Sequence, residues 1–235
     1  MQQLWNQSAF HTPCFLRMHE ITHLGFEPCV VAHAECDHGF VFDIEFVHGS
    51  LRENLAIHFH LLLHACPDFR LRAVDGKTYA RDDFRDKPVL VVMFICNHCP
   101  YVKAVEDRII GLARELETRG VQFVGVCAND AAQYPDDAFD KLAERWRDRG
   151  YGFPYLHDEA QDVARAFGAV CTPDIFVYDG DRRLAYRGRI DDSWKDESRV
   201  TRRELAGAIE ALVAGKRPSP EQRPSMGCSI KWRES

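Results

Sequence analysis

Apolar runs alternate with amphipathic and polar segments between residues 89 and 127. The uninterrupted apolar run 89–95 is rich in β-branched and large side chains, which is typical of a strand buried on both faces. After it, apolar residues recur at spacings of three and four with charged residues between them, so we expect an amphipathic helix that ends at Gly120. A second apolar run at 121–127 predicts the next strand.

Turn and capping residues predict the remaining elements. Asp75-Gly76 suits a tight turn, so the segments 69–74 and 77–79 are expected to form a hairpin. The other predicted elements follow in chain order: a helix opened by Pro135 and stopped by Gly150, a short helix capped by Asp158 with Gln161 and ended by Gly168, strands at 175–178 and 184–189, and a helix capped by Thr201 with Glu204 and stopped by Gly215.

This order of elements predicts an α/β fold. A strand, a helix and a second strand at the front imply a parallel pair joined by a crossover helix, and the closing hairpin adds antiparallel strands. We therefore expect a mixed central sheet with helices on both faces. The segment 216–226 contains three prolines and is expected to be irregular.

The first 65 residues differ in composition from the rest of the chain. Nine of the 11 histidines lie in residues 1–64, and residues 1–65 carry seven acids and two bases, whereas the remainder is nearly neutral. Alternation predicts a strand at 42–46, and Ser50 with Glu53 would cap a helix at 51–64. These patterns divide the chain into an N-terminal extension at 1–65, a core domain at 66–214 and a C-terminal tail at 215–235.

Three interpretations of the N-terminal extension stay open. It is a metal-binding extension, a packed accessory segment, or a non-native extension from an upstream start. The metal-binding interpretation depends on two partial ligand sets, which are His58, His60 and His64, and Cys29, His33 and Cys36.

The overall composition narrows the function classes. With 46% hydrophobic and 28% charged residues the sequence is ordinarily globular, and a formal net charge of −6 argues against a broad nucleic-acid-binding surface. No apolar run approaches the length of about 18 residues that indicates a membrane span. The start lacks the basic and apolar regions of a secretory signal, and nine cysteines cannot all pair within one chain. We therefore expect a cytoplasmic protein with mostly reduced thiols.

The sequence Cys96-Asn97-His98-Cys99 lies between the buried strand and the long helix. A cysteine at a helix N-terminus faces unpaired backbone N–H groups and the positive end of the helix dipole, and both favour the thiolate. The spacing lets Cys96 attack a substrate disulfide and Cys99 resolve the mixed disulfide, and a positive charge on His98 would further favour the thiolate.

Two structural interpretations of the cysteine pair compete with redox chemistry. One is half of a zinc site, which would need further ligands, and Cys127, His157 and Cys171 occur only singly along the chain. The other is a pair of buried structural thiols. The position of the pair between a strand and a helix favours redox chemistry.

The sequence at 66–214 resembles the thioredoxin-fold superfamily. The resemblance rests on the cysteine pair at a strand-to-helix turn and on Thr172-Pro173 before the strand 175–178. It implies that the Thr172-Pro173 bond is cis, that its loop faces the cysteine pair, and that the backbone before it pairs with an extended segment of the substrate. Thr172 and Pro173 are thus the expected substrate-binding residues.

More narrowly, the chain resembles the redoxin or peroxiredoxin-like branch. The matching motifs, in order, are Cys66-Pro67-Asp68-Phe69, Asp75-Gly76-Lys77, the run 87–92, Cys96 to Val102, Cys171-Thr172-Pro173-Asp174, and Gly227 to Trp232. The chain departs from two patterns of its relatives. The Pro and Thr that precede a peroxidatic cysteine are missing, and Ile95 and Leu90 stand where typical thioredoxins carry Trp and a buried Asp.

The sequence therefore predicts a thiol–disulfide oxidoreductase of the thioredoxin fold. Cys171 and Cys228 are candidate additional redox thiols. We expect no cofactor besides the Cys96–Cys99 disulfide. The expected partners are a protein or small-molecule disulfide and an external thiol reductant, with no nucleic acid and no membrane. The alternatives are an atypical thiol peroxidase that uses Cys96, and a non-enzymatic metal-binding module that uses the cysteine pair with histidines of the extension.

Overall fold

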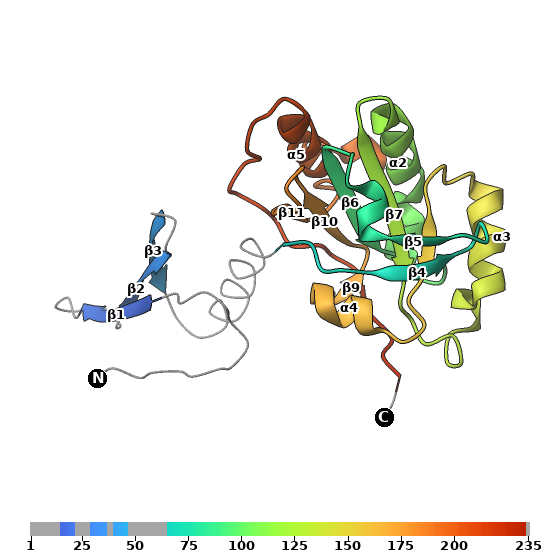
Figure 1. Ribbon diagram of the computed structural model, residues 1–235, viewed down its shortest axis with the longest axis horizontal. Coiled ribbons are helices and arrows are strands. Elements are labelled where there is room, and N and C mark those ends of the chain that lie inside the picture. Colours follow the sequence, from blue (N-terminus) through green and yellow to red (C-terminus); the bar gives the residue numbers. More distant parts are fainter. Residues whose placement is uncertain (1–14, 22–28, 37–39, 47–64, 234–235) are drawn as a thin grey trace. The chain divides into compact units, whose positions relative to one another are not determined.

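The computed structural model describes residues 15–21, 29–36, 40–46 and 65–233 (Figure 1). The chain divides into two compact units, Met1–Phe59 and His60–Ser235. The first unit contains an antiparallel sheet of β1 (Phe15–Ile21), β2 (Cys29–Cys36) and β3 (Phe40–Phe46), in that order. The predicted strand 42–46 lies in β3, whereas β1 and β2 were not predicted. The predicted helix 51–64, and the histidines at 58, 60 and 64, lie outside the described residues.

The second unit is built around a mixed sheet of seven strands in the order β11-β10-β6-β7-β8-β4-β5. The pairs β6–β7 and β7–β8 are parallel, and the other neighbours are antiparallel. The strands are β4 (Arg70–Ala73), β5 (Thr78–Ala80), β6 (Val89–Phe94), β7 (Val121–Cys127), β8 (Tyr155–His157), β10 (Asp174–Tyr178) and β11 (Leu184–Gly188). The predicted hairpin, the parallel pair and the closing hairpin are therefore confirmed, and β8 was not predicted.

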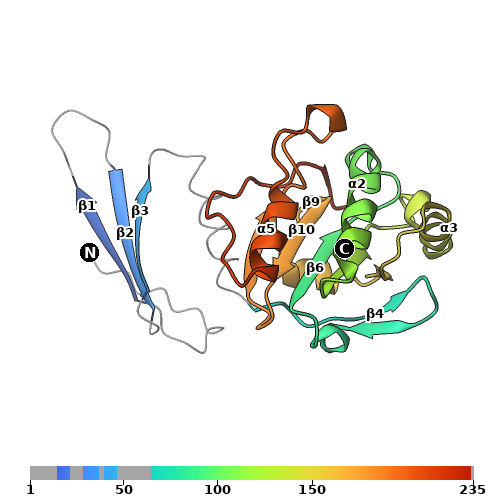
Figure 2. The ribbon, with the colours of Figure 1, turned by 90° about the horizontal axis from the view of Figure 1, so that it is seen from above.

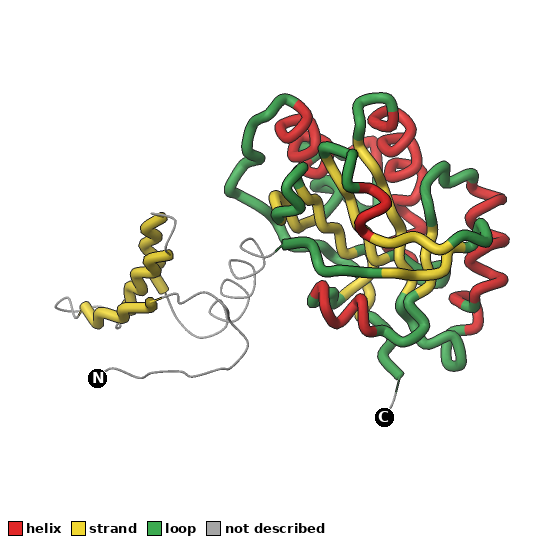
Figure 3. The backbone as a smooth tube through the Cα atoms, viewed as in Figure 1, coloured by secondary structure: helices red, strands yellow, loops and turns green. Residues whose placement is uncertain are grey.

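Helices cover both faces of the sheet (Figures 2 and 3). The α-helices are α2 (Pro100–Glu117), α3 (Phe139–Arg149), α4 (Asp162–Phe167) and α5 (Glu204–Val213), and short 3-10 helices occupy Arg81–Phe84, Pro135–Asp137 and Glu197–Arg199. Buried residues of α2, α3 and α5 belong to one core cluster, and those of α4 belong to the other. None of the described helices is long and apolar enough to cross a membrane.

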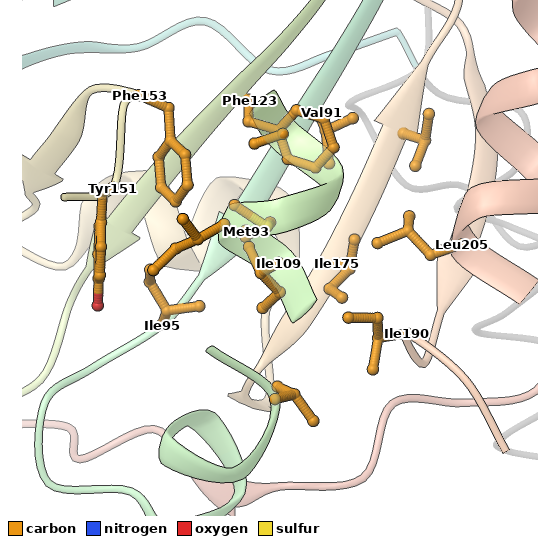
Figure 4. Close-up of a cluster of buried hydrophobic side chains, with 14 of the residues drawn as sticks. Val91, Met93, Ile95, Ile109, Phe123, Tyr151, Phe153, Ile175, Ile190 and Leu205 are labelled. Carbon is orange, nitrogen blue, oxygen red and sulfur yellow. The ribbon is translucent and has the colours of Figure 1, made fainter. Parts of the chain in front are cut away.

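The central strand β6 supplies side chains to both cores. Val89, Val91 and Met93 belong to the cluster under α2 and α5, in which Figure 4 labels Val91 and Met93. The intervening Leu90, Val92 and Phe94 belong to the cluster that contains α4. All six residues of β6 are at most 1% exposed. Because successive strand residues face opposite sides, a strand in the middle of a three-layer fold must be apolar throughout. This explains the continuous apolar run, which ends directly before the cysteine pair.

Three predicted helix starts are wrong. Ala138 is extended, with φ −63° and ψ 148°, so Pro135 opens a separate turn and α3 begins at Phe139. Gln161 does not complete a capping box, because its amide donates to the carbonyls of Ala128 and Lys231, although the Asp158 carboxylate does accept from the Ala164 N–H. Nor do Thr201 and Glu204 form one. Thr201 donates to Asp192, and Glu204 accepts from Arg189.

Candidate redox site

The two cysteines of the motif lie at the junction between β6 and α2. Strand β6 ends at Phe94, and Cys99 is the residue that precedes the first turn of α2, with Pro100 in the first helical position. Proline is favoured there because its missing N–H would have no partner inside the helix. Cys96 is 1% exposed and Cys99 is 0% exposed. The sequence thus folds into a short buried loop that presents both sulfurs at the end of the sheet.

The loop before β10 contacts both sulfurs. The Thr172–Pro173 peptide bond is cis, as the resemblance predicted. The Thr172 hydroxyl lies 3.3 Å from Cys96 Sγ, and the Cys99 thiol donates to the Thr172 carbonyl oxygen at 3.1 Å. One residue therefore links the two cysteines.

The two thiols of the motif have opposite electrostatic surroundings. The pKa of the Cys99 thiol is lowered to about 4, chiefly by its hydrogen bond with Cys96 and further by Thr172 and the backbone N–H of Val102. The Thr172 carbonyl opposes this change because it accepts the thiol proton. The pKa of the Cys96 thiol is raised by its hydrogen bond with Cys99, by burial and by the nearby Asp137 carboxylate. The positive end of an 18-residue helix favours a negative charge on Cys99, in the same direction as its lowered pKa.

A buried carboxylate that the sequence analysis missed holds the loop from the other side. Asp137 is 0% exposed. Its Oδ1 accepts the backbone N–H groups of Asn97 at 2.7 Å and His98 at 3.3 Å, and its Oδ2 accepts the Asn129 amide at 2.8 Å. It thus fixes the backbone between the two cysteines. Its only signal in the sequence was an acidic pair after Pro135, and such a pair is ordinary in an exposed turn.

His98 is engaged by the same carboxylate. Its Nδ1 lies 2.6 Å from Asp137 Oδ2, and its ring stacks on Tyr134 with centroids 4.6 Å apart. The arrangement therefore orients the ring firmly, and the influence of His98 on the thiols stays a prediction.

Residues 62–187 match the model of the AhpC/TSA family, which is more than half of the chain. The chain belongs to the AhpC/TSA family. The crystal structure of an uncharacterized conserved protein from Geobacillus kaustophilus is 42% identical, covers 73% of this chain and 92% of its own, and has a TM-score of 0.70. A hypothetical protein from Sinorhizobium meliloti 1021 is 38% identical, with coverages of 73% and 94% and a TM-score of 0.70.

A third solved structure bears on the fold alone. It is a solution structure of a candidate protein disulfide isomerase from Bacteroides thetaiotaomicron, 15% identical over 64% of this chain and 89% of its own, with a TM-score of 0.50. No curated protein is significantly similar to the chain. The architecture is thus the thioredoxin-like fold, in a redoxin branch, that the sequence motifs predicted.

The C-terminal tail of this AhpC/TSA-family chain returns to the site. Strand β12 (Cys228–Ser229) pairs antiparallel with β9 (Cys171–Thr172), and Cys228 lies directly opposite Thr172. Gly227 packs so closely that an added Cβ would lie 2.1 Å from the Thr172 carbonyl oxygen. Apart from β12, residues 216–233 form no regular strand or helix, as predicted for 216–226.

The other candidate thiols and ligands are arranged differently. The Cys171 thiol donates to the Pro173 carbonyl oxygen, and burial raises its pKa to about 12. Burial also raises the pKa of Cys127 and lowers that of His157. Each of these groups is thus kept neutral by its surroundings, which does not favour nucleophilic or charged roles.

One group of side chains in the described part of the chain could hold a metal ion. Cys96, His98 and Asp137 offer ligand atoms that all lie within 4.8 Å of one another. However, the Asp137 carboxylate already contacts Asn97, His98 and Asn129. A metal would have to replace several of these contacts, so the geometry supports a positioned carboxylate better than a metal ligand. Histidines 58, 60 and 64, and the side chains of Cys29, His33 and Cys36, lie outside the described atoms.

Proposed function

We propose that the protein is a thiol–disulfide oxidoreductase in which Cys99 is the attacking thiolate and Cys96 the resolving thiol. The observation that carries the proposal is the shared contact of both sulfurs with Thr172, with the low-pKa sulfur at the N-terminus of α2. Thiol–disulfide exchange needs a thiolate and a neighbouring thiol that can displace the first product. Family membership and the thioredoxin-like fold support the same class of chemistry.

The assignment of roles differs from the sequence expectation, which placed the nucleophile at Cys96. The helix begins at Pro100, directly after Cys99, so the favourable end of the helix dipole acts on Cys99. The pKa of Cys96 is instead raised by its hydrogen bond with Cys99, by burial and by the nearby Asp137 carboxylate. A thiol that holds its proton until a mixed disulfide forms nearby is suited to be the resolving thiol, which breaks that mixed disulfide.

The exchange proceeds in two steps that conserve electrons. The Cys99 thiolate attacks one sulfur of a substrate disulfide, and the other sulfur leaves as a thiolate. Cys96 then gives up its proton and attacks Cys99 Sγ, which releases the second substrate thiol and leaves a Cys96–Cys99 disulfide. An external thiol reductant restores the dithiol by the reverse chemistry. The reaction as proposed uses the protein's own thiols and no additional cofactor.

Thr172 and Pro173 are the proposed substrate-binding residues. The carbonyl oxygen and hydroxyl of Thr172 lie beside the two sulfurs, and β9 pairs with β12 of the tail at this point. An extended peptide bearing a disulfide would have to replace β12 beside β9 to present its sulfur to Cys99. We therefore propose two kinds of substrate. Protein disulfides would bind along β9, and small disulfides would react with the thiolate without binding there.

Trapping experiments with single variants test the proposal. Reduced Cys96→Ser protein should attack a small aromatic disulfide through Cys99, and peptide mapping by mass spectrometry should find Cys99 in a disulfide. Cys99→Ser protein should form no adduct in the loop 96–99. The control is Cys66→Ala, which removes a buried thiol from the opposite core cluster and should react as the unchanged protein does. Adduct formation on Cys96 in Cys99→Ser, as rapid as on Cys99 in Cys96→Ser, would contradict the role of Cys99.

Peroxide reduction is a second candidate, favoured by the family match and by a low-pKa cysteine that precedes Pro100. The Cys99 thiolate would attack the peroxide O–O bond to give a sulfenic acid and an alcohol or water, and Cys96 would condense with it to a disulfide and water. Val92 and Cys96 stand where the family's Pro and Thr precede a peroxidatic cysteine. Peroxide consumption by Cys99 that is no faster than consumption by free cysteine would exclude this activity.

A further inference from the structure

The C-terminal tail is fixed against the redox domain on both sides of β12. Before β12, Gln222 contacts Ala185 and the backbone of Arg187, and the Ser225 hydroxyl donates to the Gly188 carbonyl oxygen. After β12, Ile230 is 3% exposed in the core cluster of α4, and the backbone N–H of Lys231 donates to Asn129. In Figure 1 the tail, in red, leaves α5, passes the edge of β9 and continues toward α4. These contacts place β12 at the site by many independent interactions.

The register of β12 puts Cys228 on the side of the cysteine pair. Directly opposite residues in an antiparallel pair project to the same face of the sheet. Cys228 is opposite Thr172, whose hydroxyl contacts Cys96, whereas Ser229 is opposite Cys171. The Cys228 thiol interacts with the Cys99 thiol, and burial together with this interaction raises the Cys228 pKa to about 11. Three sulfurs therefore surround Thr172, while Cys171 projects to the other face.

Exposure distinguishes Cys228 from the other two thiols. Cys96 and Cys99 are at most 1% exposed, whereas Cys228 is half-buried. In this arrangement a disulfide between Cys96 and Cys99 would join two residues that are at most 1% exposed. A disulfide that includes Cys228 would have one sulfur at the surface.

We propose that Cys228 is a third redox thiol of the site, which exchanges with Cys99 and carries the disulfide from the buried pair to the surface. This inference rests on the proposed function, because it needs a reactive Cys99. Cys228 attacks Cys99 Sγ in the Cys96–Cys99 disulfide, a Cys99–Cys228 disulfide forms, and Cys96 leaves and takes the proton that Cys228 gives up. The exchange conserves electrons. An external thiol then reduces the surface disulfide and becomes oxidised itself.

The position of Cys228 also explains why its high pKa does not prevent this step. Part of the raised pKa comes from the hydrogen bond and charge of the Cys99 thiolate. Once Cys99 is in a disulfide, that charge is absent and Cys228 loses its proton more easily. The third thiol is thus held neutral until a disulfide appears beside it.

The test uses the full-length protein with Cys96 removed. Reduced Cys96→Ser protein is treated with the aromatic disulfide of thionitrobenzoate, and disulfide-linked peptides are mapped by mass spectrometry. We expect a link between the peptides that carry Cys99 and Cys228. Cys96→Ser/Cys228→Ser should retain the thionitrobenzoate adduct on Cys99 instead, and Cys96→Ser/Cys228→Ala provides a second variant with the same expectation. The matched control is Cys96→Ser/Ser229→Ala, which changes the neighbouring residue of β12 and should keep the link.

The outcomes separate this inference from the proposed function. If Cys96→Ser keeps a stable adduct on Cys99 while Cys228 stays free, the relay is wrong and the attacking role of Cys99 stands. If Cys99 acquires neither an adduct nor a link in any variant, both proposals are wrong. A Cys99–Cys228 link that appears in Cys96→Ser and disappears in both Cys228 variants supports the relay.

Discussion

Replacing Gly227 by alanine should loosen the C-terminal tail from the redox site. The added Cβ would lie 2.1 Å from the Thr172 carbonyl oxygen, 2.5 Å from its carbonyl carbon and 3.0 Å from Pro173 N, all backbone atoms of the cis loop. Neither backbone can yield without disturbing the β9–β12 pair. Overpacking of this kind costs about 1–3 kcal/mol. In a domain of this size, such a loss lowers the melting temperature by roughly 2–12 °C.

The same free energy should also appear as local opening of the tail. Because about 1.4 kcal/mol corresponds to a tenfold change in an equilibrium constant, the open tail becomes about 5- to 150-fold more populated. The assay is the rate at which iodoacetamide modifies Cys99, which is 0% exposed with the tail in place, followed by peptide mapping, together with thermal unfolding. The matched control is Gly111→Ala in α2, where no atom lies within 4 Å of the added Cβ. It should leave the Cys99 rate unchanged and be neutral or stabilising, by up to about 1 kcal/mol. A Gly227→Ala protein with unchanged melting and an unchanged Cys99 rate would refute the close contact.

Substitutions at two positions test how the site sets the thiol pKa values. Cys96→Ala should raise the Cys99 pKa by about 1–2 units, because a hydrogen bond to a charged group contributes about 1.5–3 kcal/mol, whereas Cys96→Ser should raise it less because the hydroxyl can still donate. Thiolate absorbance as a function of pH measures both, and equal values for Ala and Ser would count against the hydrogen bond. Asp137→Asn should lower the Cys96 pKa, since it removes a nearby negative charge, and should destabilise the fold by about 1–3 kcal/mol through lost charge-assisted bonds to the loop. The rate of Cys96 alkylation as a function of pH measures the change in pKa, and urea unfolding measures the loss of stability. An unchanged Cys96 pKa would show that the carboxylate does not act on the sulfur.

The sequence was sufficient to predict elements whose apolar pattern is periodic. In a layered fold, the apolar run at 89–95 fits only a buried strand, and the apolar spacing in 102–116 fits only an amphipathic helix. Both predictions were confirmed, as β6 and α2. The cysteine pair followed from its position between them. The cis Thr172–Pro173 bond could be expected only through the resemblance, because nothing in the local sequence distinguishes it from a trans turn.

Features that depend on distant contacts could not be predicted in this way. Asp137 acts on the loop 96–98, about forty positions away, and no local pattern marks a carboxylate that becomes buried. The capping boxes at 158–161 and 201–204 failed because their side chains bond to the tail, to Arg189 and to Asp192 instead. The tail contains three prolines and has no periodic apolar pattern. Its short pairing with β9 therefore depends on contacts with the rest of the domain, which the local sequence does not reveal.

The most direct test of the central claim is the pH dependence of Cys99 alkylation in the reduced, full-length protein. With limiting iodoacetamide and peptide mapping, Cys99 should be the first residue of the pair to be modified. Because its pKa is lowered to about 4, its rate should stay nearly constant from about pH 6 to about pH 9, whereas an ordinary thiol has a pKa of about 8.5. Modification of Cys96 first, or a Cys99 rate that rises about tenfold per pH unit from about pH 6 to about pH 8 as for an ordinary thiol, would contradict the account.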